Sequence, residues 1–418
     1  MSIFQFSVKG ACLLVAAIAL LLGGCGGGGS TPSPVVEVAP VFKAQKISAG
    51  NGVSLLTKPD GSAWAFGLGS FAQLGNDALV DVAVPGPVLG LSEVAEVAAA
   101  ENSSMALRSD GSVWVWGLNE DGTLGANTKD VCAAPGSTTS YACTKTPLPV
   151  TNLNAVRAIA AGPGYKAVAK LDGSVWGWGS WTGGMFDNGV SSSVSKSPQA
   201  VAGLAGIRSI SVGSGHALAL DANGETWAWG YNLYGQLGTS VVGAPLPQKV
   251  VGLSRVKAVA AGGYQSIALK EDGSVWVWGI YGVGSYTWVV TDIGLSGVVS
   301  VAAGKDHALV LKADGTVWGW GKNSYGQVGV GGTSDVLVPT QISGLSDVMA
   351  ISAGTQHSLA VKRDGSVWVW GSVLEASVAA SDKCTFTYVD THGTNPTGQT
   401  FTYVYPCAKR PMALKAQS

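Results

Sequence analysis

The amino-acid sequence predicts an all-β protein, a seven-bladed β-propeller whose blades are four-stranded antiparallel sheets. An eight-residue segment of the type DGSVWVWG recurs seven times in the 418-residue chain, and its period of about 50 residues is typical of propellers and solenoids. Glycine, at 60 residues, is about twice as frequent as usual, and the charged share of 12% is about half the usual one. This composition suits many short strands joined by tight turns.

The seven copies of this segment differ little from one another. They begin at Asp60, Asp110, Asp172, Asn223, Asp272, Asp314 and Asp364. Asp-Gly or Asn-Gly between two apolar stretches is a strong hairpin signal, because a type I′ turn needs a positive φ at both central residues. Each copy therefore marks a tight turn followed by a strand.

Each repeat unit contains four predicted strands. In residues 158–179 an apolar stretch ends in Ala-Gly, a second stretch follows, and Asp-Gly separates it from the tryptophan strand. A Gly-rich loop such as 232–238 and a Pro-led stretch such as 247–253 complete a unit. Trp176 and Trp178 share one side of the pleat, and Val175 and Gly177 lie on the other side. A sheet with two apolar faces must be covered on both, which radial stacking of blades achieves.

We expect residues 45–418 to form this single propeller, with the two ends of the chain closing the ring. Residues 410–414 resemble the Pro-led stretch of the other units, and residues 46–50 begin the first unit. Truncation from position 411 onward is therefore expected to lower the melting temperature markedly.

Residues 1–44 are predicted to lie outside the propeller. The apolar run 11–22 is shorter than the roughly 20 residues that span a bilayer, but it fits the core of a secretory signal in residues 1–24. The Leu-Gly-Gly-Cys that follows resembles the lipobox of bacterial lipoproteins, which implies lipidation of Cys25. An ordinary signal peptide with a chance cysteine is the alternative. Residues 25–44, rich in Gly, Ser and Pro at their start, are expected to form a flexible tether.

Lipidation at the N-terminus predicts a protein of the cell envelope. One acyl chain gives marginal membrane binding, whereas two or more give stable anchoring. Gly26 stands where similar lipoproteins retained in the inner membrane carry Asp. The expected location is therefore the outer membrane, on its periplasmic or its exposed side.

Four cysteines remain when the signal peptide and Cys25 are set aside, and an exported chain is expected to oxidise them. Four cysteines allow three connectivities. Each pair brackets an insertion at the same place in its unit, with the parallel endings Cys-Thr-Lys-Thr-Pro and Cys-Ala-Lys-Arg-Pro. The predicted disulfides are Cys132–Cys143 and Cys384–Cys407, and each would staple a long surface loop.

The repeat motifs resemble those of the regulator of chromosome condensation family over residues 45–415. They read AAG, His-Ser/Ala-Leu-Ala-Leu, DGSVWVWG and Asn-x-x-Gly-Gln-Leu-Gly in this order. The resemblance implies the propeller and, for eukaryotic members, nucleotide exchange on a small GTPase and binding to nucleosomes. An exported lipoprotein meets neither partner, and the Gly-Gln-Leu-Gly loop is degraded at 180–186 and 281–286 and absent after Gly371. Similarity to bacterial inhibitors that clamp secreted enzymes gives a second candidate function.

The residue types that carry catalysis have structural explanations in this pattern. The repeated Asp belongs to a turn. His216, His307 and His357 share one repeat column, where a structural role is favoured over a shared metal, and His392 stands alone. Because no nucleophile, nucleotide or dinucleotide motif is present, we expect no enzyme activity, no cofactor and no metal. A cell-wall enzyme and a nucleotide-exchange regulator are the weaker alternatives. The net charge of −1, without a basic stripe, argues against nucleic acid as a partner.

Binding is expected on the face opposite the Asp-Gly turns, where the units differ most from one another. A protein or an envelope polymer is the expected partner of a monomeric propeller. Aromatic side chains concentrate on this face in units three to six, and such clusters form binding hot spots. The alternative is that several of these side chains only cover the edges of blades. The candidate binding residues are Trp181, Phe186, Tyr231, Tyr234, Tyr281, Tyr286, Trp288 and Tyr325.

Overall fold

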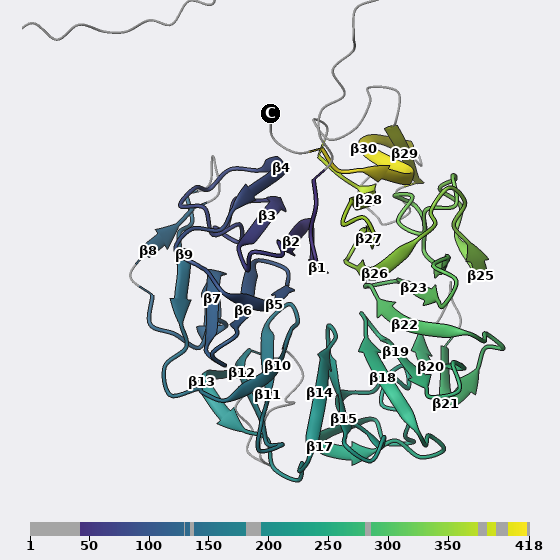
Figure 1. Ribbon diagram of the computed structural model, residues 1–418, viewed down its shortest axis with the longest axis horizontal. Coiled ribbons are helices and arrows are strands. Elements are labelled where there is room, and N and C mark those ends of the chain that lie inside the picture. The colour runs from purple at the N-terminus through teal and green to yellow at the C-terminus, as the bar shows by residue number, and fades with distance from the viewer. Residues whose placement is uncertain are drawn as a thin grey trace, which may run out of the picture. The chain divides into compact units, whose positions relative to one another are not determined.

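A computed structural model describes residues 42–128, 130–133, 138–180, 194–280, 286–374, 383–389 and 400–415. Over these residues the chain forms seven antiparallel sheets, called blades 1 to 7 in chain order, which follow one another around a ring (Figure 1). The predicted all-β seven-bladed propeller is confirmed. Helix in the described residues is limited to the 3-10 turn η1 (Glu120–Gly122), and none of their helices is long and apolar enough to cross a membrane.

Each blade is a meander of consecutive strands that runs outward from the axis. The innermost strands are β1 (Lys46–Ala49), β5 (Val94–Ala99), β10 (Val156–Ala161), β14 (Ile207–Val212), β18 (Val256–Ala261), β22 (Val298–Ala303) and β26 (Val348–Ala353). The second strands are β2 (Val53–Thr57), β6 (Ser103–Arg108), β11 (Tyr165–Lys170), β15 (His216–Asp221), β19 (Gln265–Lys270), β23 (His307–Lys312) and β27 (His357–Lys362).

The two outer positions follow the same order. The third strands, which carry the tryptophans, are β3 (Ala63–Gly67), β7 (Val113–Leu118), β12 (Val175–Ser180), β16 (Thr226–Tyr231), β20 (Val275–Ile280), β24 (Val317–Gly321) and β28 (Val367–Ser372). The fourth strands are β4 (Val82–Pro87), β9 (Tyr141–Pro149), β13 (Val194–Ala200), β17 (Gly243–Lys249), β21 (Tyr286–Asp292), β25 (Val336–Gln341) and β30 (Thr400–Ala413).

Blades 2 and 7 each carry a fifth strand that the sequence did not predict. The insertions bracketed by cysteines fold back as hairpins, so that β8 (Asp130–Cys132) pairs with β9 and β29 (Lys383–Val389) pairs with β30. Both extra strands lie on the outside of the ring (Figure 1). The other five blades have the four strands that the sequence predicted.

The core lies between the blades. The second aromatic residue of each tryptophan strand is buried against the preceding blade, and Trp116 of blade 2, for example, packs with Val53, Leu55 and Leu74 of blade 1. A glycine ends this motif, and between the third and fourth strands the register shifts at it. Gly67 has φ +110°, and a Cβ there would lie 2.0 Å from the carbonyl oxygen of Gly52, so glycine is required.

The two ends of the chain meet on blade 7, as expected. The Phe42 N–H donates to the carbonyl of Leu414 (2.8 Å), and the Ala44 N–H donates to that of Gly365 (2.9 Å). Phe42 and Ala44 are buried, so residues 42–44, which the sequence assigned to the tether, belong to the propeller instead. Residues 1–41, with Cys25, lie outside the described residues.

Candidate binding face

The meander gives the propeller two different faces. The Asp-Gly turns between the second and third strands, such as 108–112 and 270–274, lie on one side, called the turn face. The loops that follow the first and third strands, such as 262–264 and 232–242, lie on the other side, called the loop face.

The Asp side chains of the turn face hold their own turns. The Ser112 N–H (2.9 Å) and hydroxyl (2.6 Å) both donate to Asp110 Oδ1, and the Trp114 Nε1–H donates to Ser112 Oγ (3.2 Å). Hydrogen bonds from Ser112, first from its hydroxyl, hold the pKa of Asp110 below its ordinary value. The same pair of bonds to Asp recurs at Asp60, Asp172, Asp272 and Asp314. The predicted turn role of this column is confirmed.

Cations cover the half-buried first tryptophan of six units on the turn face. Lys58 Nζ lies 3.5 Å from a ring centroid of Trp64, and Lys362 Nζ lies 4.3 Å from that of Trp368. Such contacts stabilise exposed sites by about 0.5–1 kcal/mol. The repeated residues of the turn face thus have structural partners within their own blade.

The histidine column joins neighbouring blades. His216 Nε2 lies 2.7 Å from Ser266 Oγ in the next blade, and the Ser266 hydroxyl donates to the carbonyl of Gln236 (2.8 Å). Since that hydroxyl hydrogen is used on the carbonyl, His216 donates from Nε2. Burial lowers the pKa of His216 and His307 to about 3 and that of His357 to about 4, so the rings are neutral. The structural role predicted for His216, His307 and His357 is confirmed, whereas His392 lies outside the described residues.

A lysine replaces this arrangement between blades 2 and 3. Lys166 stands in the serine column, is fully buried, and donates from Nζ to Ser103 Oγ at 2.7 Å. Burial lowers the pKa of its ammonium group to about 7. Between blades 2 and 3, a Lys–Ser pair therefore takes the bridging role of the His–Ser pairs.

The mouth of the central channel lies on the loop face. A cavity of about 120 Å³ is lined by the ends of the inner strands of all seven blades, five of which read Ala-Gly. Backbone bonds tie neighbouring blades around it, as from Ser214 N to Gly262 O (3.0 Å) and from Thr355 N to Gly50 O (3.0 Å). The residue that follows each of these ends differs in every blade, and these residues are Asn51, Glu101, Pro163, Ser214, Gly263, Lys305 and Thr355. A rigid rim thus presents varied side chains.

Three tyrosines from two segments, one in blade 4 and one in blade 5, gather on the loop face. The ring centroids of Tyr234 and Tyr264 are 5.1 Å apart, and those of Tyr231 lie 6.5 Å and 6.2 Å from them. We call Tyr231, Tyr234 and Tyr264 the tyrosine cluster, and all three are partly exposed. The sequence predicted two of them and missed Tyr264, although it is the one aromatic residue in a column that holds small or polar residues in six units.

The loop that carries Tyr234 is fixed by its own polar side chains. Asn232 Oδ1 accepts from the Leu237 N–H (2.7 Å), and Gln236 Oε1 accepts from the Tyr234 N–H (3.0 Å). At Gly235 a Cβ would lie 2.8 Å from the Cα of Trp288, so this loop packs on β21 of blade 5. The structure therefore brings the backbone of Trp288 close to the tyrosine cluster.

The other predicted binding residues are distributed more widely. Tyr286 is exposed on β21, and Tyr325 is half-buried in the corresponding loop of blade 6. Trp181, Phe186 and Tyr281 lie outside the described residues.

The outer rim of blades 4 to 6 is apolar. Val242, Val289 and Leu337, at or beside the outermost strands of these blades, are 72%, 69% and 70% exposed. In the part of the chain that the structure describes, the outermost strands β17, β21 and β25 have no fifth strand over them. Uncovered edges and exposed apolar side chains are typical of surfaces that pair with another chain.

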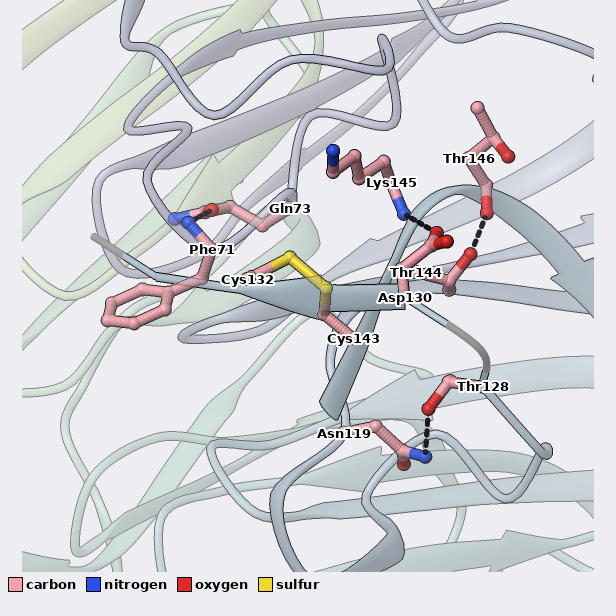
Figure 2. The surroundings of a disulfide bond; sticks show 10 residues. All are labelled: Phe71, Gln73, Asn119, Thr128, Asp130, Cys132, Cys143, Thr144, Lys145 and Thr146. Atoms are coloured by element: carbon pink, nitrogen blue, oxygen red, sulfur yellow. Dashed lines mark hydrogen bonds between the residues drawn. A yellow bond between two sulfur atoms is a disulfide. The ribbon is translucent and has the colours of Figure 1, made fainter. Parts of the chain in front are cut away.

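The structure contains both predicted disulfides, Cys132–Cys143 and Cys384–Cys407. In blade 2 the bond joins the two strands of the extra hairpin (Figure 2). It is buried against Ala72 of blade 1. The Phe71 and Tyr141 rings meet edge to face nearby, at 6.5 Å. Asp130 accepts from the Lys145 N–H (3.3 Å) across the same hairpin. The insertion is thus fixed to two blades.

Among the described residues, no three His, Cys, Asp or Glu side chains come together as a metal site.

Two family models, both described as Regulator of chromosome condensation (RCC1) repeat, match the chain. One matches residues 60–107, 110–168, 223–269 and 314–361, and the other matches 94–123, 207–236 and 298–327. Together they cover more than half of the chain. The matches are the units whose loops keep the motifs described above.

Comparisons with individual proteins agree with these models. The E3 ubiquitin-protein ligase HERC2 of Homo sapiens and that of Mus musculus are each 42% identical over 84 residues, 19% of this chain, so the chain matches 2% of their length. Prp20p from Saccharomyces cerevisiae has 22% identity and a TM-score of 0.68, covering 91% of this chain and 88% of its own. Human WBSCR16 has 23% identity and a TM-score of 0.67, covering 77% and 87%. At these identities the solved structures establish the fold alone.

Proposed function

Because the chain belongs to the regulator of chromosome condensation (RCC1) repeat family, we propose that its propeller is a rigid scaffold that binds another protein through the loop face of blades 4 to 6. The tyrosine cluster is the observation that carries this proposal. Its rings come from two blades, they are partly exposed, and the loop that carries Tyr234 is held by hydrogen bonds. Pre-ordered aromatic side chains lose little entropy on binding and are enriched in hot spots.

The apolar rim of the same blades supports a protein partner. Val242, Val289 and Leu337 extend the surface outward from the cluster, and an open outer strand offers backbone groups to a strand of the partner. Prp20p is described as binding Gsp1p and histones, which are proteins, but nucleotide exchange is not part of our proposal. The proposed activity is binding without catalysis. Trp181, Phe186 and Tyr281 remain predicted members of this surface.

The proposed place of action is the cell envelope, with the propeller held at the outer membrane by a lipidated Cys25. The apolar run 11–22 and the Gly-rich residues that follow Cys25 support it. The test is fractionation of cells that carry wild type or Cys25→Ser. We expect the wild type in the membrane fraction and the variant released from it, and a variant that stays membrane-bound would contradict the anchor.

The binding proposal is tested by photo-crosslinking in cells. A benzophenone amino acid is placed at Tyr234 of the full-length protein, and a matched control carries it at Ser274 on the turn face of blade 5. We expect a protein adduct from position 234 and none from position 274. An adduct that resists protease would identify an envelope polymer instead, and equal labelling from both positions would reject the loop face as the site.

A further inference from the structure

The seam between blades 7 and 1 differs from the junctions that keep the Gly-Gln-Leu-Gly motif. After blades 1, 4 and 6, a loop of this type inserts between its blade and the next. At the first of these junctions the Ser104 hydroxyl (2.7 Å) and the Trp116 Nε1–H (2.9 Å) both donate to the carbonyl of Gln73. The same carbonyl of Gln236 accepts from Ser266 (2.8 Å) and Trp278 (2.8 Å).

The inserted loop also fills the space between two blades. Leu74 is 1% exposed and packs against Trp116, and Gly75, with φ +67°, lies so close to this indole that a Cβ would be 2.8 Å from Nε1. Leu237 and Val328 are equally buried at the other two junctions. The repeat therefore defines its own ligand, a carbonyl followed by an apolar side chain and a glycine.

Blade 7 lacks this motif, yet blade 1 keeps the receiving serine. Ser54 Oγ lies 2.9 Å from His357 Nε2, as the serines of blades 5 and 7 lie from their histidines. The sequence from Gly371 to β30 holds no Gly-Gln-Leu-Gly or Gly-Gln-Val-Gly motif that could supply a counterpart of Gln236 O. The aromatic residue at the indole position is Phe66, which has no N–H to satisfy. The seam thus keeps the serine hydroxyl donor, in Ser54, and lacks the indole N–H donor of the filled junctions.

A cavity of about 110 Å³ lies at this place, against the roughly 10–15 Å³ that one water needs. Its lining combines apolar and polar side chains, and it includes Ser54, Phe66, Leu68, His357, Val369 and Val373. This is the chemistry that the loops meet at the filled junctions. A site with a buried donor and apolar walls favours a ligand that supplies an acceptor and an apolar group.

We propose that this seam is a peptide-binding site, which takes a partner protein's segment of the form Gln-Leu-Gly or Gln-Val-Gly in the way that blades 2, 5 and 7 take the chain's own loops. The backbone carbonyl of the segment accepts from the Ser54 hydroxyl, while His357 donates to Ser54 Oγ. The Leu or Val side chain packs against Phe66 and Val369. This site is separate from the tyrosine cluster.

The test uses a synthetic peptide with the sequence of residues 232–238, NLYGQLG, in which the second Leu, the one of Gln-Leu-Gly, is replaced by photo-leucine. It is irradiated with the full-length protein, and adducts are mapped by mass spectrometry. We expect adducts within residues 66–68 or 369–374, competed by unlabelled NLYGQLG and not by NLYGQDG. Adducts spread over the surface, or none, would overturn the proposal.

Variants locate the hydrogen bond. Ser54→Ala is expected to weaken the peptide's affinity roughly threefold to tenfold, the usual effect of one lost neutral hydrogen bond, whereas the matched Ser104→Ala at a filled junction leaves it unchanged. Leu68 is 38% exposed, so Leu68→Asp keeps the fold and blocks the cavity if Ser54→Ala does not fold. Unchanged affinity in a folded Ser54→Ala or Leu68→Asp protein would overturn the site.

Discussion

The turn face and the loop face of this propeller are built from the same repeats but are used differently. On the turn face, the Asp of five units makes the same two hydrogen bonds with a Ser or Thr two residues later. On the loop face the residue that follows the end of the inner strand differs in every blade, and two blades carry stapled hairpins. Repetition here marks residues that hold a blade together, whereas departure from repetition marks the surface on which we propose that a partner binds.

Blade 4 shows how strictly the turn is kept. Asn223 replaces the usual Asp, and Asp221, two residues earlier, accepts from the Asn223 and Glu225 N–H groups instead (2.9 Å each). The acceptor survives the substitution. No comparable constraint acts on the tyrosine cluster, whose column at Tyr264 holds Gly, Asn, Asp or Gln in the other blades.

The largest expected effect comes from acid, through the histidines that lie below the loop face. Unfolded histidine takes a proton near pH 6.5, whereas the buried rings do so only near pH 3 to 4. The free energy of unfolding is therefore expected to fall as the pH drops below about 6.5, by up to about 2 kcal/mol per histidine at pH 5.

Urea unfolding at pH 7 and pH 5 measures this loss in wild type and in His307→Gln. Gln265 fills the same column in blade 5, so the variant has a natural model. The loss of unfolding free energy between the two pH values should be smaller in the variant than in wild type, by the contribution of one histidine, up to about 2 kcal/mol. Glu96, whose pKa burial raises to about 7, acts in the opposite direction in both proteins, so the difference between them is the informative quantity. Equal losses would contradict the neutral buried rings.

The next effect comes from the staples of blades 2 and 7. Replacing Cys384 and Cys407 by Ser removes a crosslink over 23 residues and is expected to lower the free energy of unfolding by about 3 kcal/mol. Thermal unfolding with and without reductant measures it. Reductant should lower the melting temperature of wild type more than that of the variant, while binding at blades 4 to 6 stays the same. If the variant without this disulfide no longer bound the partner, the binding surface would have to include the stapled hairpins instead.

The smallest expected effect comes from the turn face. Asp272→Ala removes two short hydrogen bonds in an exposed turn, so we expect a lower melting temperature than wild type, with a smaller loss than that caused by removing a disulfide. Hydrogen bonds also lower the pKa of Asp272 in the folded protein. Its contribution to stability should therefore be present at neutral pH and lost as the pH falls through that lowered pKa. A variant that loses the partner would contradict the division between the two faces.

Local sequence signals predicted the features that depend on neighbouring residues. Asp-Gly turns, the tryptophan strands and the two disulfides follow from short motifs and parallel insertions, and the structure has each of them. The fifth strands were missed because both insertions bracketed by cysteines were interpreted as stapled surface loops, although each contains a turn dipeptide, Pro-Gly at 135–136 and Asn-Pro at 395–396. The boundary at 44 was placed too late because Phe42 and Ala44 are held by residues of blade 7, more than 300 positions away in sequence.

The candidate site was harder to predict for a related reason. Tyr264 joins Tyr231 and Tyr234 only because blade 5 stacks on blade 4, and no pattern within one unit shows this contact. Lys166 and the cavity beside Ser54 also arise between blades. In each case a signal was present as a departure from a column, with Lys in place of Ser and Phe66 in place of Trp.

The most direct test of the account is the affinity of the crosslinked partner for the tyrosine-cluster variant. Tyr234→Ala with Tyr264→Ala is compared with wild type and with Asp272→Ala by isothermal titration calorimetry, after circular dichroism shows that all three are folded. We predict that the double variant binds at least tenfold more weakly, since a real aromatic anchor contributes about 2 kcal/mol or more, and that Asp272→Ala binds like wild type. Unchanged affinity in the folded double variant would contradict the claim that blades 4 to 6 form the binding surface.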